Sequence, residues 1–127
     1  MCIRDRTITA IENKFVHIIG HPTGRLLARR DPYQINMDDV ISAAEENNKI
    51  LELNAYPDRL DLKDTHCKKA KEHKVKIAIN TDAHSISDLG FMKFGIFTAR
   101  RGWIEKTDVI NTLPLNDLKK LLGCRDI

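Results

Sequence analysis

The sequence predicts an α/β fold built from parallel strands, and three observations support this. Short runs rich in β-branched residues, typical of strands, occupy residues 15–20, 50–54 and 75–80. Each is followed by a longer amphipathic segment, typical of a helix, at residues 37–48, 63–73 and 87–100. The alternation of strand and helix is the order of βα units around a parallel sheet.

The first half of the chain contains two strands and one helix. The strand at 15–20 is closed by Gly20 and Pro22, because proline cannot donate to a sheet ladder. The helix at 37–48 follows Asn36, a favoured N-cap residue, and carries acidic residues in its first turn. The strand at 50–54 ends before Pro57.

The second half adds a basic amphipathic helix at 63–73 and a third strand at 75–80. A helix at 87–100 and two short helices at 107–111 and 115–122 complete the chain. No G-x-G-x-x-G motif follows any strand, which argues against a dinucleotide-binding sheet. About three βα units fit either a small open sheet or the last part of a barrel, and periodicity alone leaves both open.

Composition narrows the class of protein. The 127 residues are 42% hydrophobic and 31% charged, which excludes collagen-like and wholly disordered chains. The net charge of +3 permits a nucleic-acid partner without demanding one. Three scattered cysteines (Cys2, Cys67 and Cys124) favour neither a disulfide framework nor a cysteine zinc site. With neither an apolar span nor a signal peptide in the sequence, we expect a cytoplasmic protein without a membrane partner.

Polar residues follow the predicted strands at the edge where parallel α/β proteins place their sites. His21 follows the first strand, Asn54 ends the second, and Asp82 and His84 follow the third. Asp82 and His84 are two residues apart, so an extended segment points both side chains to one side. Imidazole and carboxylate groups are suitable metal ligands, and His21, Asp82 and His84 form a candidate partial metal site. In the structural alternative His21 only packs, and Asp82 caps the following helix.

Arginines form a second group near the same strand ends. They are Arg25, Arg29 and Arg30 after His21, Arg59 after Asn54, and Arg100 and Arg101 after the third strand. Guanidinium groups beside a metal site suit a phosphate ester, because they bind its oxygens in a bidentate manner. The alternative is a solvated basic surface paired with Asp31, Asp58 and Asp61.

Four stretches resemble one known family. They are I-I-G-H-P-T-G-R-L-L-A-R-R-D-P-Y (18–33), L-E-L-N-A-Y-P-D-R-L-D-L-K-D (51–64), I-N-T-D-A-H-S (79–85) and F-G-I-F-T-A-R-R-G-W (94–103). Together they resemble the last third of the polymerase and histidinol phosphatase (PHP) domain of bacterial and archaeal family-X DNA polymerases. The resemblance runs from about residue 11 to residue 122. The first and last stretches resemble the polymerase branch in particular.

The resemblance implies the C-terminal portion of a PHP-type (β/α)7 barrel with a metal centre at its mouth. It implies up to three divalent metal ions, Mn²⁺ or Zn²⁺, with His21, Asp82 and His84 as ligands. Asp82 and His84 would be catalytic, and Arg25, Arg59, Arg100, Arg101 and Asn54 would lie at the substrate phosphate. The implied activity is a metal-dependent phosphoesterase, a 3′–5′ exonuclease that processes DNA 3′ ends in repair.

The chain departs from the family at its beginning. The H-x-H motif that opens the family domain is absent, and residues 1–6 do not resemble the family. We therefore expect a non-native or poorly ordered leader at residues 1–10 and a C-terminal PHP part at residues 11–127. The expected partners are DNA 3′ ends, the missing N-terminal part of the barrel and a polymerase region, and the chain alone is expected to be inactive.

Two other functions stay open from the sequence. One is a stand-alone PHP phosphatase that acts on a small phosphomonoester such as histidinol phosphate. The other is a metal-free remnant that serves as a structural or interaction module. Activity on DNA oligonucleotides compared with small phosphomonoesters separates the first from the polymerase function, and the absence of both activities would favour the second.

Overall fold

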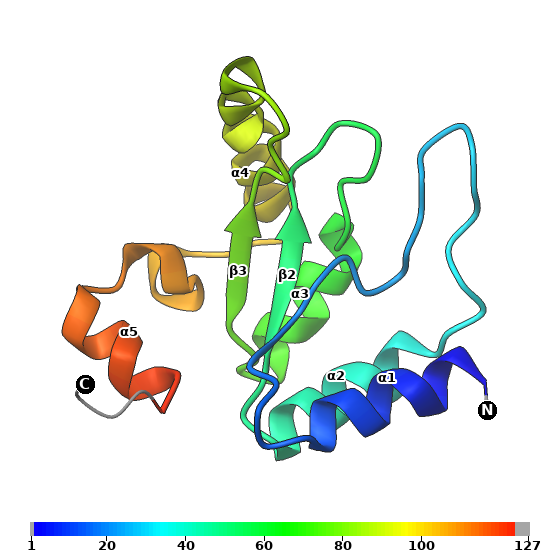
Figure 1. The fold of residues 1–127 in the computed structure, drawn as a ribbon, viewed down its shortest axis with the longest axis vertical. Helices are drawn as coiled ribbons and strands as arrows, with labels where there is room; N and C mark the ends of the chain where they lie inside the picture. The colour runs from blue at the N-terminus through cyan, green and yellow to red at the C-terminus, as the bar shows by residue number, and fades with distance from the viewer. Residues whose placement is uncertain (1, 124–127) are drawn as a thin grey trace.

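The computed structural model describes residues 2–123 and is an α/β fold (Figure 1). Its strands are β1 (Ile18–Ile19), β2 (Ile50–Asn54) and β3 (Ile77–Asn80). Its α-helices are α1 (Ile3–Glu12), α2 (Met37–Glu46), α3 (Asp64–Glu72), α4 (Met92–Arg101) and α5 (Leu115–Leu121). Three short 3₁₀ helices are η1 (Ile86–Phe91), η2 (Lys106–Asp108) and η3 (Ile110–Thr112).

The strands form one parallel sheet in the order β1-β2-β3. Ile18 lies opposite Ile50, and Asn54 lies opposite Asn80, so the carboxyl ends of all three strands reach the same edge. The α/β class and the parallel strands predicted from the sequence are confirmed, with a helix after each strand. Closure of such a sheet into a (β/α)7 barrel stays a prediction.

One face of the sheet carries the main core. Leu51 and Leu53 of β2 and Ile77 of β3 are fully buried there. Val40 and Ile41 of α2 pack in the same cluster, together with residues of α3 and α4. Helix α4 approaches the sheet closely at Gly95, where an added Cβ would lie 2.6 Å from the Ile79 side chain. The amphipathic segments thus became helices because their apolar stripes cover this face.

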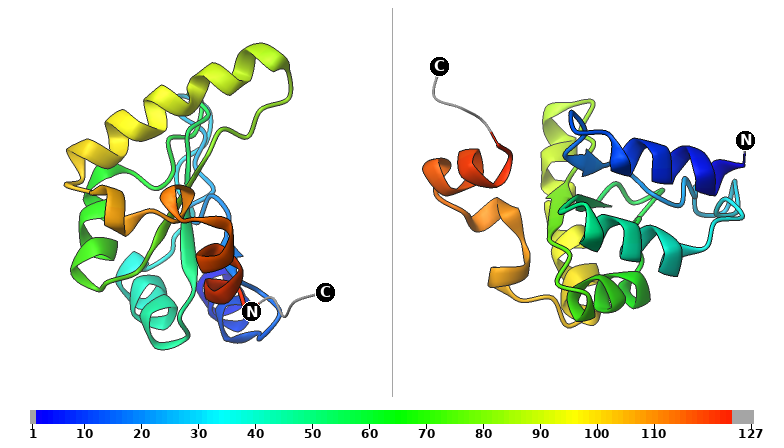
Figure 2. Two further views of the ribbon diagram at one scale, coloured as in Figure 1. Left: turned by 90° about the vertical axis from the view of Figure 1, so that its left-hand side faces the viewer. Right: turned by 90° about the horizontal axis from the view of Figure 1, so that it is seen from below.

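The other face of the sheet is covered near the beginnings of β2 and β3. Ile50 of β2, Ala78 of β3 and Ile110 of η3 form a second, smaller core, against which Leu118 of α5 packs. Figure 2 shows α5 on the opposite side of the sheet from α1 and α2. Towards the carboxyl ends of the strands this face becomes polar, and there the candidate site lies.

Several elements are shorter than predicted. The strand expected at 15–20 contains only Ile18–Ile19, because the paired residues of β2 begin at Ile50, opposite Ile18. The helix expected at 87–100 is divided into η1 and α4. Gly90 lies near this junction, and glycine disfavours a continuous α-helix.

The N-terminal residues form a helix that the sequence analysis did not predict. Helix α1 contacts α2, and its Ile11 is fully buried. The expected boundary between residues 10 and 11 therefore falls inside α1, and the division into a leader and a PHP part stays a prediction. None of the helices in the described residues is long and apolar enough to cross a membrane. Cys124 lies outside the described residues.

Candidate functional site

The carboxyl ends of β2 and β3 bring Asn54, Asp82 and Arg59 together. Asn54 is 1% exposed, and its Nδ2 donates to Oδ2 of Asp82 over 3.1 Å. The same Asp82 oxygen lies 3.7 Å from Nε of Arg59. The backbone amide of Tyr56 donates to Oδ1 of Asn54, which fixes the orientation of the asparagine amide. Asp82 is thus held in place by a buried donor and an arginine, with about a third of its side chain exposed.

His84 is oriented by the chain on both sides of it. Its Nδ1 lies 2.6 Å from the carbonyl oxygen of Asp82, and its backbone amide donates to Oδ2 of Asp88. This hydrogen bond from the His84 amide is the main reason that the pKa of Asp88 is lowered. Because a carbonyl only accepts, Nδ1 carries a proton, and in the neutral imidazole the lone pair is therefore on Nε2. The exposed imidazole therefore presents Nε2 as a ligand or proton acceptor.

His21 is held through its backbone by Glu52. The His21 amide donates to Oε2 of Glu52 over 2.7 Å, and Oε1 of Glu52 accepts from Nδ2 of Asn80 over 2.9 Å. Glu52 on β2 therefore connects the ends of β1 and β3. Sequence reasoning treated Glu52 only as part of a strand. Its position two residues before Asn54, on the same face of the strand, was the available indication.

Asp61 is a second residue that sequence reasoning did not place in the site. It was considered only as a surface partner of arginine, yet it is fully buried. Its Oδ2 accepts from the backbone amides of Thr23 and Gly24, both at 3.0 Å. Burial raises the pKa of Asp61, while the bonds from Thr23 and the nearby Arg25 oppose that rise. Asp61 thus fixes the loop that begins at His21.

The arginines separate into two groups. Arg25 donates from Nε to the Arg59 carbonyl and also binds the Leu60 carbonyl, so it joins two strand-end loops. Arg59 lies at Asp82, as described above. Arg101 pairs with Asp64 at the beginning of α3, and Arg100 is exposed at the same end of α4.

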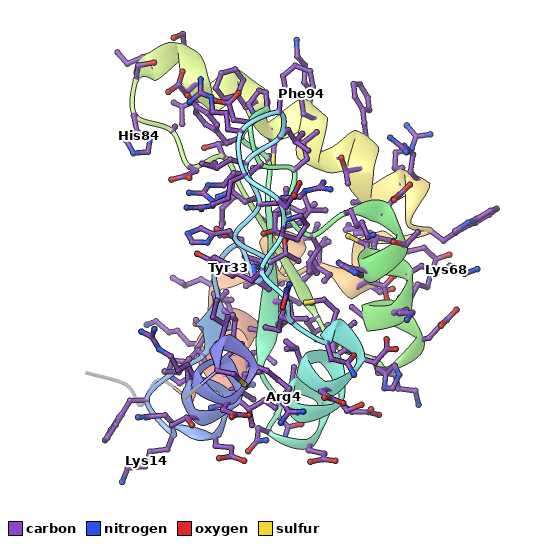
Figure 3. All side chains as sticks on the ribbon, turned by 90° about the vertical axis from the view of Figure 1, so that its right-hand side faces the viewer. Arg4, Lys14, Tyr33, Lys68, His84 and Phe94 are labelled. Carbon is purple, nitrogen blue, oxygen red and sulfur yellow. The ribbon has the colours of Figure 1, made fainter. Side chains whose placement is uncertain are left out.

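Helix α4 carries Arg100 and Arg101 away from the strand-end loops. Figure 3 shows α4 running from the side of His84 towards α3. The structure therefore brings Arg25 and Arg59 to the strand ends and leaves Arg100 and Arg101 at the far end of α4. Phosphate binding by the four arginines and by Asn54 stays a prediction.

The three predicted metal ligands have suitable donor atoms, and they do not form a closed site. Among the described residues no three histidine, cysteine, aspartate or glutamate side chains gather closely enough to hold an ion. Asp82 is already engaged with Asn54 and Arg59, and His21 is anchored through its backbone. These residues alone therefore do not fit a complete metal centre.

Comparison with known proteins adds a clear similarity. The chain is 48% identical, over 124 residues and 98% of its length, to the DNA polymerase/3′-5′ exonuclease PolX of Bacillus subtilis (strain 168). The resemblance to family-X DNA polymerases is confirmed. The chain covers 22% of this family-X polymerase.

Phosphatases are also similar to the chain. A protein named as a probable phosphatase in Thermoanaerobacter sp. (strain X514) is 34% identical over 111 residues, 83% of this chain and 43% of that protein. A probable phosphatase of Caldicellulosiruptor bescii is 36% identical over 89 residues, 65% of this chain and 34% of that protein. The chain thus spans less than half the length of each of these relatives. No family model matches it.

Proposed function

We propose that this chain is part of the phosphoesterase module of a family-X DNA polymerase and acts on DNA 3′ ends in repair. The observation that carries the proposal is the 48% identity, over 98% of the chain, to a protein named as both a polymerase and a 3′-5′ exonuclease. The polar strand ends support it, because cationic and imidazole groups at one edge suit a phosphodiester substrate. The similarity to phosphatases supports the broader class of phosphate-ester hydrolysis.

In this proposal each side chain has a defined task. Arg59 lies at Asp82 and is mostly buried, so it is suited to stabilise negative charge beside that carboxylate. His84 presents Nε2 for a proton or a ligand bond. Arg25, Glu52 and Asp61 hold the strand-end loops in position.

We also propose that the complete module uses a divalent metal, Mn²⁺ or Zn²⁺. The support is the donor chemistry of His21, Asp82 and His84, which suits these ions. Since the described residues hold no closed set of ligands, further ligands would have to come from elsewhere in a longer protein. On this basis we expect the 127-residue chain alone to be inactive as a nuclease.

The test is Asp82→Ala in a full-length polypeptide that carries this chain. We expect loss of nucleotide release from a 3′-labelled DNA oligonucleotide, with primer extension by the polymerase unchanged. Asp117→Ala, at an exposed position of α5, is the matched control. Unchanged exonuclease activity in Asp82→Ala would remove Asp82 from the site.

A second candidate function follows from the phosphatase relatives. These relatives match up to 83% of the chain, so small phosphomonoesters are the alternative substrate class. The same full-length polypeptide should release nucleotide from DNA 3′ ends faster than it releases phosphate from histidinol phosphate. The reverse preference would favour the phosphatase, and the absence of both activities would favour a structural remnant.

A further inference from the structure

A cavity of about 280 Å³ lies beside the strand-end loops, outside the group formed by Asn54, Asp82 and His84. The loop that carries His21 forms one wall through Thr23, Arg25 and Tyr33, and the beginnings of α2 and α3 form the others. The acidic and basic side chains that line it are Arg25, Asp38, Lys63, His66 and Lys69. Nothing in the proposed function assigns a role to this cavity.

The charges around the cavity are mostly positive. Three cations line it against one carboxylate, and Nζ of Lys69 is paired with Asp38 at 2.5 Å. Arg25 is held rigidly, because its Nε donates to the Arg59 carbonyl. Lys63, exposed at the start of α3, has no ion pair among the described residues. Among the residues that line the cavity, the cations therefore exceed the single carboxylate of Asp38, and the cavity is suited to an anion.

Burial and the positive charges of Lys63, Lys69 and Arg25 all lower the pKa of His66, which also lines the cavity. Its Nδ1 is buried and has no hydrogen-bond partner in the part of the chain that the structure describes. The pKa of His66 is lowered to about 4, mainly by burial and in addition by Lys63, Lys69 and Arg25, while Asp38 opposes them. His66 is thus neutral near pH 7 in a positive field, with a ring nitrogen that lacks a partner.

We propose that this cavity binds the phosphate group of a nucleotide. Its volume of about 280 Å³ is just below the usual range for ligand pockets, roughly 300–1,000 Å³, and therefore suits a ligand no larger than a single nucleotide. Lys63 and Arg25 would face the phosphate oxygens, and Tyr33, Ile35 and Pro32 supply apolar surface for the base or sugar. Binding of a phosphate here is independent of the proposed function, whereas the assignment of that phosphate to a DNA strand rests on it.

The test measures binding without catalysis. Thymidine 5′-monophosphate is dialysed to equilibrium against the 127-residue chain with a chelator present, so that neither metal nor turnover contributes. We expect Lys63→Glu to weaken binding by about tenfold or more, since it reverses a charge at the phosphate. Lys63→Gln should give a smaller loss. Lys68→Glu is the matched control, because Lys68 lies on α3, does not line the cavity, and points away from the cavity residue Tyr33 in Figure 3.

The outcomes separate this proposal from the proposed function. Competition by inorganic phosphate and a loss confined to the Lys63 variants would support the cavity even if the exonuclease proposal failed. Tighter binding of a single-stranded oligonucleotide than of the mononucleotide, lost in the same variants, would assign the phosphate to a DNA strand. Equal binding by Lys63→Glu and the unmodified chain, or an equal loss in Lys68→Glu, would overturn the proposal.

Discussion

The two faces of β2 are built by different forces. Leu51 and Leu53 point to the helix-covered face and are completely buried among apolar side chains. Ile50, Glu52 and Asn54 point to the other face, which changes from apolar to polar towards the carboxyl end of the strand. Glu52 and Asn54 are held there by hydrogen bonds to the neighbouring loops.

This difference separates stability from function within one strand. The covered face depends on close packing, so the removal of volume there should be costly whatever the chemistry of the site. The polar face depends on a few directed bonds, so changes there should affect stability less and the position of the site more. Substitutions on the two faces test that division.

The largest effect is expected on the packed face. Leu53→Ala should lower the free energy of unfolding by about 2–5 kcal/mol, since it leaves a cavity in the core. Urea unfolding of the variant and the unmodified chain measures the loss. Leu115→Ala, at a position that is 66% exposed, is the matched control and should cost far less. Similar losses in both variants would show that the apolar cluster around Leu53 does not dominate stability.

A smaller effect is expected at Asp61, where a loop meets the end of β2. Asp61→Ala should cost about 1–3 kcal/mol, because two buried amide groups, those of Thr23 and Gly24, lose their acceptor. Asp61→Asn keeps an acceptor oxygen and should cost less. Thermal unfolding of both variants measures the difference, and equal losses would contradict the role of these two bonds.

The pH dependence of stability provides a second test of Asp61. Because burial raises its pKa in the folded state, the folded chain binds the proton more tightly than the unfolded chain. The contribution of Asp61 to stability should therefore fall as the pH rises from the ordinary value of 3.8 through the raised pKa. Asp61→Asn should lack this fall in urea unfolding between about pH 3 and about pH 7. An identical pH profile in both proteins would contradict the raised pKa.

The fold was predictable because its strongest patterns are local. Residues 50–54 were predicted as a strand with the bounds of β2, since a short apolar run is closed by Pro57. Asn36 was predicted as an N-cap, and its side chain does accept from the Asp38 amide. The bounds of β1 were wrong because they depend on where its neighbour begins, which the local sequence does not contain.

The candidate site was predictable only in part. Asp82 and Asn54 follow different strands, and the parallel register brings them into contact as expected for strand ends. Arg101 was predicted beside them because, like Asp82, it follows the third strand. In the structure, Arg101 lies at the far end of α4 and pairs with Asp64. Asp61 was missed because it accepts from backbone amides far away in the sequence, and no residue pattern records such a contact. Glu52 was missed in the same way, although its position two residues before Asn54 placed it on the polar face of the strand.

The smallest effect on stability is expected at Glu52, on the polar face. Glu52→Ala removes the acceptor of the His21 amide and of the Asn80 side chain, both near solvent, so water replaces much of the loss. The cost should be about 1 kcal/mol. Amide hydrogen exchange at His21 should nevertheless become clearly faster, because its protecting bond is gone.

The control for Glu52 is Glu46→Ala, at an exposed position of α2. It should change neither stability nor exchange at His21. If Glu52→Ala cost as much as Leu53→Ala, the polar face would carry the fold as well as the site. If exchange at His21 stayed slow, Glu52 would not be what holds the loop. A small cost together with fast exchange at His21 would show that Glu52 mainly positions the site, whereas its neighbour Leu53 mainly stabilises the fold.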